Sequence, residues 1–191
     1  MKILHLITAS LFAFAFFACQ QSAPEANTAA NGSAASDAGH KKGQADVQDP
    51  SSKKNILQIA IGSKDHTTLV AAVQAAELEN VLVNAGPLTV FAPTNEAFAA
   101  LPDGTVDNLL KPENKKLLAR LIKFHAAPGK YTKALLKDGQ RLFMASGHYV
   151  NVEKKGDDIY VDGGKIIGTV EASNGLVHVV DKVMLLPELK K

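Results

Sequence analysis

Residues 141–180 constrain the fold of this chain most strongly. They contain short runs rich in apolar residues, separated by the turn dipeptides Gly156-Asp157, Gly163-Gly164 and Asn174-Gly175. Short apolar runs between such dipeptides are typical of antiparallel β-hairpins, and Asn-Gly favours a type I′ turn with positive φ at both central residues. We therefore expect strands at 141–145, 148–153, 158–161, 166–170 and 176–180, with a type I′ turn at Asn174-Gly175.

Residues 55–124 show helical periodicity instead. Apolar residues recur at helical spacing in 56–61, around 81–82, in 97–101 and in 112–124. A further helix is expected after 62, with Ser63 or Asp65 as its cap and Leu69, Val73 and Ala76 on its buried side. One run, 88–92, is rich in β-branched and aromatic residues and is expected to be a strand. Helices first and strands last predict an α+β domain, in which N-terminal helices pack on a mostly antiparallel sheet.

The first residues of the chain have the pattern of a targeting segment. Lys2 precedes an apolar run over residues 6–18 that is too short to span a membrane as a mature helix. Cys19, the only cysteine, follows Ala18 in an arrangement that resembles a lipobox, although Phe16 stands where leucine is usual. We interpret 1–18 as a signal peptide and Cys19 as the site of lipid attachment, with an ordinary secretory signal as the alternative.

The amino-acid composition changes abruptly in residues 19–52. Ala, Ser, Asn, Gly, Gln and Pro dominate, and the apolar residues have no helical or strand period. Such a segment is typical of a flexible tether, with a reach of roughly 30 Å for its length. We expect secretion and lipid anchoring, at the outer membrane because Gln20 and not aspartate follows the cysteine. The membrane is expected to be contacted through the lipid only.

Composition excludes some classes of function for the remaining domain. The formal net charge is only +2, and lysines are dispersed among carboxylates, so no nucleic-acid partner is expected. No phosphate-binding glycine loop or nucleophile elbow surrounds Ser146 or Ser173, so we predict that the protein is not an enzyme. The domain histidines lack metal-ligand spacing, so neither a metal nor another cofactor is expected.

Three motifs resemble those of the fasciclin family. Residues 89–98 resemble the first signature, with Phe91, Pro93, Thr94 and Phe98, and residues 174–181 resemble the second, with Asn174, Gly175, His178 and Asp181. Between them, Phe124-His125 resembles the family's tyrosine-histidine motif, with phenylalanine in place of tyrosine. The resemblance covers 53–188 and implies one fasciclin-like domain in a single-domain bacterial lipoprotein.

We expect the motif residues to hold the fold. Phe91 and Phe98 are large apolar anchors, Thr94 can cap a helix, and His125 and His178 are expected to be buried and hydrogen bonded. In some animal members the tyrosine-histidine region is implicated in integrin binding, and Phe124 departs from that motif.

The resemblance implies a non-catalytic adhesion or binding module that contacts a surface or matrix protein or a polysaccharide. The alternative is a periplasmic ligand-binding protein in which His125, His148 or His178 holds a metal or haem. Within the domain we expect the binding surface at 146–168, with His148, Tyr149 and Asn151 as candidates. There polar residues alternate with Val150 and Val152, which are expected to face inward. A solvated hairpin without a partner, and the basic face of the 112–124 helix near Lys116 and Arg120, are the alternatives.

Overall fold

The computed structural model describes residues 53–190, so the expected signal peptide, Cys19 and the tether lie outside the described residues. The α-helices are α1 (Ile56–Ile61), α2 (Thr67–Ala75), α3 (Glu79–Asn84), α4 (Asn95–Ala99), α5 (Thr105–Leu109) and α6 (Lys115–Phe124). The strands are β1 (Leu88–Pro93), β2 (Ala126–Pro128), β3 (Arg141–Phe143), β4 (Tyr149–Lys155), β5 (Asp158–Val161), β6 (Gly164–Ala172) and β7 (Gly175–Val180). Short 3-10 turns lie at Lys64–His66, Pro112–Asn114 and Pro187–Leu189. Within 53–190 no helix has the length and apolar character needed to span a bilayer.

The strands form one seven-stranded sheet in the order β2-β1-β7-β6-β5-β4-β3. Within residues 53–190 every strand pairing is antiparallel except that of β1 with β7, which confirms the expected α+β class with a mostly antiparallel sheet. The Ala145 N–H, just after β3, donates to the Ala126 carbonyl of β2 at 2.7 Å. The two ends of the strand order therefore approach each other, and the sheet curls.

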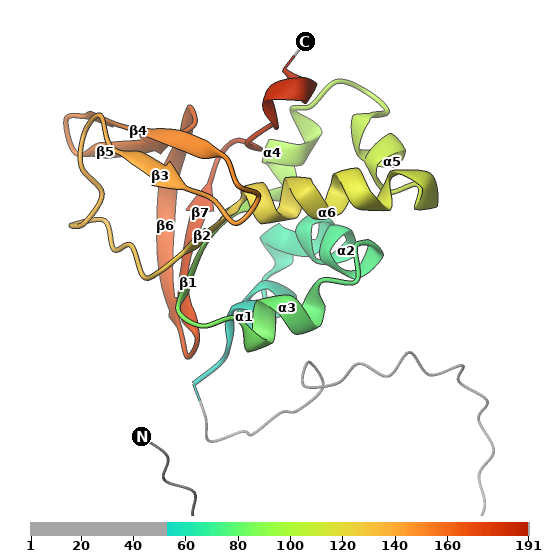
Figure 1. The fold of residues 1–191 in the computed structure, drawn as a ribbon, viewed down its shortest axis with the longest axis horizontal. Helices are drawn as coiled ribbons and strands as arrows, with labels where there is room; N and C mark the ends of the chain where they lie inside the picture. Colours follow the sequence, from blue (N-terminus) through green and yellow to red (C-terminus); the bar gives the residue numbers. More distant parts are fainter. Residues whose placement is uncertain (1–52, 191) are drawn as a thin grey trace, which may run out of the picture. The chain divides into compact units, whose positions relative to one another are not determined.

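Both faces of β1 and β7 are buried, each against a different layer. Val90, Ala92 and Val177 line a cavity together with side chains of α1, α2 and α6, so this face packs on the helices. Phe91 and His178, on the opposite face, share the inside of the curl with the β4 and β5 side chains of Val152 and Val161. Figure 1 shows the helices gathered on one side, with β4, β5 and β6 on the other.

The corner after β1 begins two helices at once. Thr94 caps its own helix, α4, by accepting a hydrogen bond from the Ala97 N–H at 3.3 Å. Asn95 reaches α2, where its side-chain oxygen accepts from the Thr68 N–H at 3.0 Å and its amide donates to the Lys64 carbonyl at 2.9 Å. These bonds satisfy backbone groups that a helix start leaves unpaired, so the first signature joins β1, α2 and α4.

The expected turn type at Asn174-Gly175 is wrong. β6 and β7 are joined by Ser173 and Asn174, neither of which has positive φ. The two-residue turn with positive φ at both central positions is instead Asp162-Gly163, between β5 and β6, with φ of 50° and 81°. Asn174 is needed for its side chain, which reaches back to the helices, and not for a left-handed backbone.

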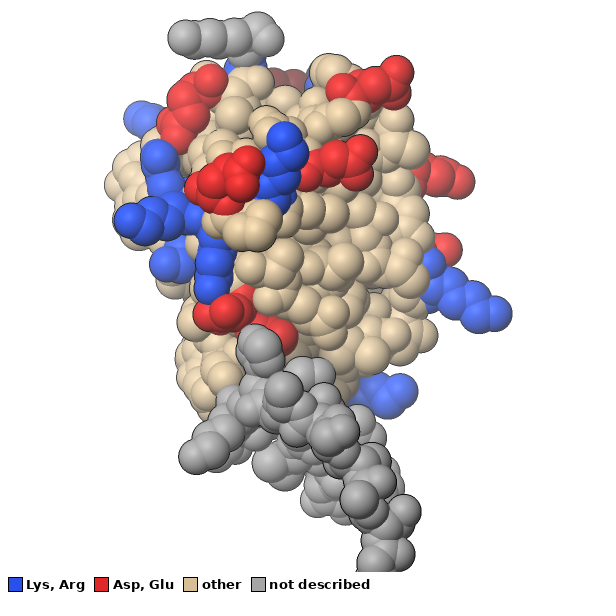
Figure 2. Space-filling model, turned by 90° about the vertical axis from the view of Figure 1, so that its right-hand side faces the viewer, with Lys and Arg blue, Asp and Glu red and all other residues tan. Residues whose placement is uncertain are grey.

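The surface of the helical side is mixed in charge. Figure 2 shows basic side chains gathered toward one edge, with acidic ones among them, and a broad uncharged area beside them. On α6 the expected basic face is partly neutralised, since Lys115 pairs with Glu77 at 2.6 Å and Arg120 pairs with Glu188 at 2.8 Å. Within residues 53–190 the helical side therefore does not present the continuous basic surface that binds nucleic acid.

Candidate functional site

His178 is committed to the interior of the curled sheet. It has no exposed surface and stacks on Phe91 with ring centroids 5.5 Å apart. Its Nε2 lies 2.7 Å from the Tyr131 carbonyl and must donate, so the neutral ring accepts the Thr169 hydroxyl at Nδ1, 2.9 Å away. Burial lowers the pKa of His178, which favours this neutral form.

His125 is the second histidine without a free nitrogen. Its Nδ1 donates to the Leu121 carbonyl at 2.8 Å, and its Nε2 accepts from the Met184 N–H at 3.0 Å. The bond from the Met184 N–H connects the end of α6 to the segment that follows β7. Burial lowers the pKa of His125 from 6.5 to about 4, and the hydrogen bond to Leu121 opposes that shift only in part.

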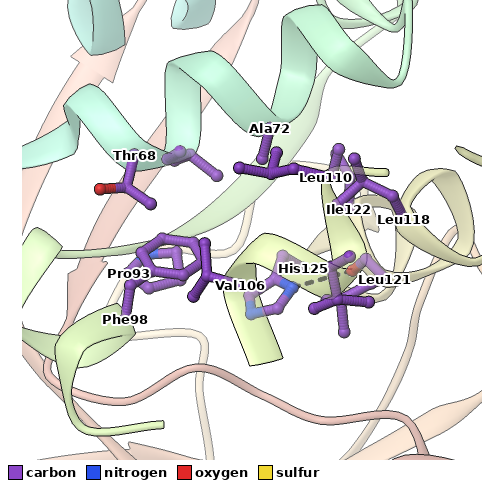
Figure 3. Close-up of a pocket in the computed structure, with 12 residues that line it drawn as sticks. Thr68, Ala72, Pro93, Phe98, Val106, Leu110, Leu118, Leu121, Ile122 and His125 are labelled. Atoms are coloured by element: carbon purple, nitrogen blue, oxygen red, sulfur yellow. Dashed lines mark hydrogen bonds between the residues drawn. The ribbon is translucent and has the colours of Figure 1, made fainter. Parts of the chain in front are cut away.

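The cavity beside His125 is small and apolar. It lies between α2, α4, α5 and α6, has a volume of about 20 Å³, and is lined by Pro93, Phe98, Leu118 and their neighbours. Figure 3 shows the His125 ring at its edge with the bond to Leu121. A second cavity of about 30 Å³ shares Leu69, Ile122 and His125 with the first. Each has room for about one water but offers it too few polar partners, and neither can hold a haem.

The buried neutral histidine predicts a loss of stability in mild acid. Between about pH 6.5 and pH 4 the unfolded chain binds a proton at His125 that the native state excludes. The free energy of unfolding should therefore fall as pH falls, by roughly 3 kcal/mol in total. Over this range the folding equilibrium constant should fall about tenfold per pH unit. Urea unfolding at several pH values should show this slope.

His125→Gln is the matched variant for that measurement, because a glutamine can still accept from the Met184 N–H but has no proton to gain in this range. It should be less stable than wild type at neutral pH and should lose stability more slowly on acidification. An unchanged slope would show that His125 is not the group responsible.

The second signature closes the contact between sheet and helices. The Asn174 side chain donates to the Leu82 carbonyl of α3 at 2.7 Å and accepts from the Ile56 N–H of α1 at 3.0 Å. Gly175 lies against the backbone of Leu88 so closely that a Cβ there would overlap it. Asp181 accepts from the Lys165 N–H at 2.8 Å and fixes the start of β6. Asn174, Gly175 and Asp181 of this motif therefore stabilise the fold.

An exposed aromatic pair lies on β3 and β4. Phe143 and Tyr149 are direct cross-strand partners with ring centroids 5.2 Å apart, and they remain 47% and 56% exposed. The Arg141 guanidinium lies 4.8 Å from the centre of the Tyr149 ring, within cation–π distance. Large aromatic side chains are normally buried, so an exposed pair beneath an arginine is a candidate binding surface.

This surface extends along β4. Exposure alternates from Tyr149 to Glu153, with Val150 and Val152 buried, as expected. Asn151 is exposed opposite Arg141, and Tyr160 of β5 lies opposite Glu153. We call Arg141, Phe143, Tyr149, Asn151, Glu153 and Tyr160 the outer β3–β5 face.

His148 does not belong to the outer β3–β5 face, which corrects the grouping of His148 with Tyr149 and Asn151. It is half-buried and meets the Phe124 ring edge to face at 5.8 Å, while its Nδ1 lies 3.3 Å from the Ser146 hydroxyl. His148 precedes β4 and its ring packs on Phe124, whereas the Tyr149 ring is exposed beside Phe143. The partners Arg141 and Phe143 were not predicted from the sequence; the register of a hairpin centred on Ser146 places Phe143 opposite Tyr149 and Arg141 opposite Asn151.

The alternative with a metal or haem finds little support among the described residues. No group of three or more His, Cys, Asp or Glu side chains in residues 53–190 is placed to hold a metal ion. The lone pairs of His125 and His178 already accept hydrogen bonds, so ligation would break both interior contacts. The Ser146–His148 pair has no carboxylate beside the histidine in this part of the chain, so it lacks the third group of a hydrolytic triad.

Comparison with known proteins gives the family. Residues 64–187 match the family model described as Fasciclin domain, and this chain belongs to the fasciclin domain family. A solved structure of a FAS1 domain pair from the insect cell adhesion molecule Fasciclin I has the same fold, with a TM-score of 0.63 and 16% identity. The match covers 71% of this chain and 52% of that one.

Relatives in sequence come from bacteria and animals. Protein sll1483 of Synechocystis is 45% identical over 137 residues, which are 71% of this chain and 76% of the relative. The immunogenic protein MPB70 of Mycobacterium bovis is 30% identical over 98% of this chain and 100% of its own length. Transforming growth factor-beta-induced protein ig-h3 of Sus scrofa is 34% identical, over 71% of this chain and 20% of its own length.

Proposed function

We propose that this protein is a non-catalytic binding module, held at the cell envelope by a lipid on Cys19, that contacts a surface or matrix polymer or protein through the outer β3–β5 face. One observation carries the proposal: Phe143, Tyr149 and Arg141 form an exposed cluster, while the family motifs and the buried histidines are used to hold the fold. Membership of the fasciclin family, one relative of which is named a cell adhesion molecule, supports it.

Anchoring explains how a small contact can suffice. Many copies tethered to one surface engage a repetitive partner together, and avidity raises the overall strength by orders of magnitude above that of one contact. The tether expected at 19–52 would let each domain turn toward the partner. We propose the outer membrane as the site of anchoring, on the residues that follow Cys19.

Retention on isolated cell envelopes tests the contact. The full chain should be retained, and the triple variant Arg141→Ala, Phe143→Ala, Tyr149→Ala should lose at least about tenfold in apparent affinity, because interface tyrosines and arginines often contribute 1 kcal/mol or more each. These side chains are exposed, so the melting temperature should stay near that of wild type.

The matched control is Lys116→Ala with Lys123→Ala, on the exposed side of α6. It should leave retention unchanged. Equal retention of the triple variant and wild type would remove the outer β3–β5 face from consideration, and a loss confined to the α6 variant would move the contact to that helix.

The anchor has a separate test. Wild type should partition with membranes, whereas Cys19→Ser should be released into the soluble fraction or remain as unprocessed precursor, since no other cysteine is present to carry the lipid. Stable anchoring needs more than one acyl chain, so mass spectrometry of the mature N-terminus should find several. A soluble wild-type protein without a lipid would contradict this part of the proposal.

A further inference from the structure

The outer β3–β5 face is too small for a standard protein interface. β4 has seven residues, which at about 3.3 Å per residue gives a length of about 23 Å. β3 flanks only residues 149–151 and β5 flanks only 152–155. The strip is therefore two strands wide at any point, about 10 Å, and its area is roughly 220 Å². A stable protein partner usually buries about 800 Å² on each side. A long, narrow strip suits a polymer strand better than a globular surface.

The charges on this face are nearly balanced. Lys155 pairs with Glu153 at 3.3 Å, and Lys165 pairs with Asp158 at 2.7 Å. Arg141 has no carboxylate partner among the described residues, but its guanidinium lies against Tyr149. Three cations, Arg141, Lys155 and Lys165, face two carboxylates, Glu153 and Asp158, so the net charge is about +1 and the long-range attraction for a polyanion is small. The partner that fits it carries no net charge of its own.

Unused hydrogen-bonding groups lie beside the aromatic rings. Within residues 53–190 neither the Arg141 guanidinium nor the Asn151 amide makes a hydrogen bond, although the two residues are cross-strand partners. Together they offer several N–H donors and one carbonyl acceptor in planar groups. Phe143 and Tyr149 next to them offer flat apolar rings. Flat rings flanked by unpaired donors and acceptors complement a sugar ring, which has an apolar face and a rim of hydroxyls.

A second aromatic position lies farther along the strip. Tyr160 is opposite Glu153, four residues from Tyr149 on β4, so the two tyrosines are about 13 Å apart along the strand direction. The Lys155 ammonium lies 5.0 Å from the centre of the Tyr160 ring, a cation–aromatic contact like that of Arg141 with Tyr149. An aromatic side chain thus stands toward each end of the strip, with polar groups between.

From the area, the charge balance and this arrangement we infer that the outer β3–β5 face binds an uncharged polysaccharide chain that lies along β4. One sugar ring stacks on Tyr149 and meets Phe143, whose ring is tilted by 58° to that of Tyr149, at its edge. This inference rests on the proposed function and specifies the partner. Each domain binds weakly, and the anchored array supplies avidity.

The test uses the full chain in mild detergent and isolated envelopes treated in two ways. Protease removes the envelope proteins, and periodate opens sugar rings that carry neighbouring hydroxyls. The inference expects retention to survive protease and to be lost after periodate. Retention lost after protease and kept after periodate would overturn the polysaccharide inference while leaving the binding function standing. No retention on untreated envelopes would instead contradict the proposed function itself.

Two substitutions at one position separate stacking from simple apolar contact. Tyr149→Phe keeps the ring and should stay within about threefold of wild type, whereas Tyr149→Leu keeps apolar area without a ring and should lose about tenfold. Equal binding by both variants would overturn the stacking. Raising the salt concentration should change retention by less than about twofold, because no net charge is neutralised. A steep loss with salt would show that the polymer is charged.

Discussion

Phe91→Ala should lower the free energy of unfolding by about 3–5 kcal/mol, because it removes a fully buried aromatic ring and leaves a cavity. The ring stacks on His178 and lies on the strand that pairs with both β2 and β7. A loss of this size is comparable to the whole stability of a marginal domain. Urea unfolding followed by circular dichroism measures it.

Phe143→Ala is the matched control, since it makes the same chemical change at a side chain that is 47% exposed. It should cost less than about 1 kcal/mol, and its effect should appear in retention instead. Equal destabilisation by the two variants would contradict the assignment of one phenylalanine to the core and the other to the surface.

Gly175→Ala should destabilise by about 3 kcal/mol or more, although it adds a single methyl group. The new Cβ would overlap the Leu88 carbonyl oxygen and lie 2.9 Å from the Leu88 nitrogen, and these backbone atoms cannot turn aside as a side chain can. Leu88 and Gly175 are partners in the parallel pairing of β1 and β7. Relief of the overlap requires β1 and β7 to separate.

Gly86→Ala controls for the loss of a glycine in the same region, because a Cβ at Gly86 has no atom within 4 Å and its φ is not positive. It should be neutral or slightly stabilising. A Gly175→Ala protein with wild-type stability would show that β1 and β7 do not pack as closely as described.

The strands of the C-terminal half were predictable because local residues determine them. β5 lies at 158–161 as expected, since a turn dipeptide stands on each side of it. The alternation of Tyr149, Val150, Asn151 and Val152 also predicted which side chains are buried. In both cases the information lies within a few residues of the position in question.

Elements that depend on distant partners were missed. β2 has only three residues, ends in Pro128, and exists because Thr89 and Val90 of β1 pair with it. α5 has five residues, too few to show a helical period, and it packs against α6. The turn at Asn174-Gly175 was assigned by local preference, whereas contacts with α1, α3 and Leu88 select those two residues.

Part of the candidate site was predictable for the same reason. Alternation along one strand selects Tyr149 and Asn151, but the pairing of β3 with β4 is needed to add Arg141 and Phe143. The separation of His148 from Tyr149 depends on the contact of His148 with Phe124 at the end of α6, which is distant in sequence. Exposure of an aromatic pair cannot be read from composition, because it depends on which strands the helices cover.

The location of the binding surface is tested by a map of amide chemical-shift changes in the ¹⁵N-labelled full chain on addition of soluble polysaccharide released from envelopes. We predict changes concentrated on β3, β4 and β5, largest around Arg141, Phe143 and Tyr149, with the His125 and His178 regions unaffected. Changes concentrated on α6, or around the cavity beside His125, would contradict this location.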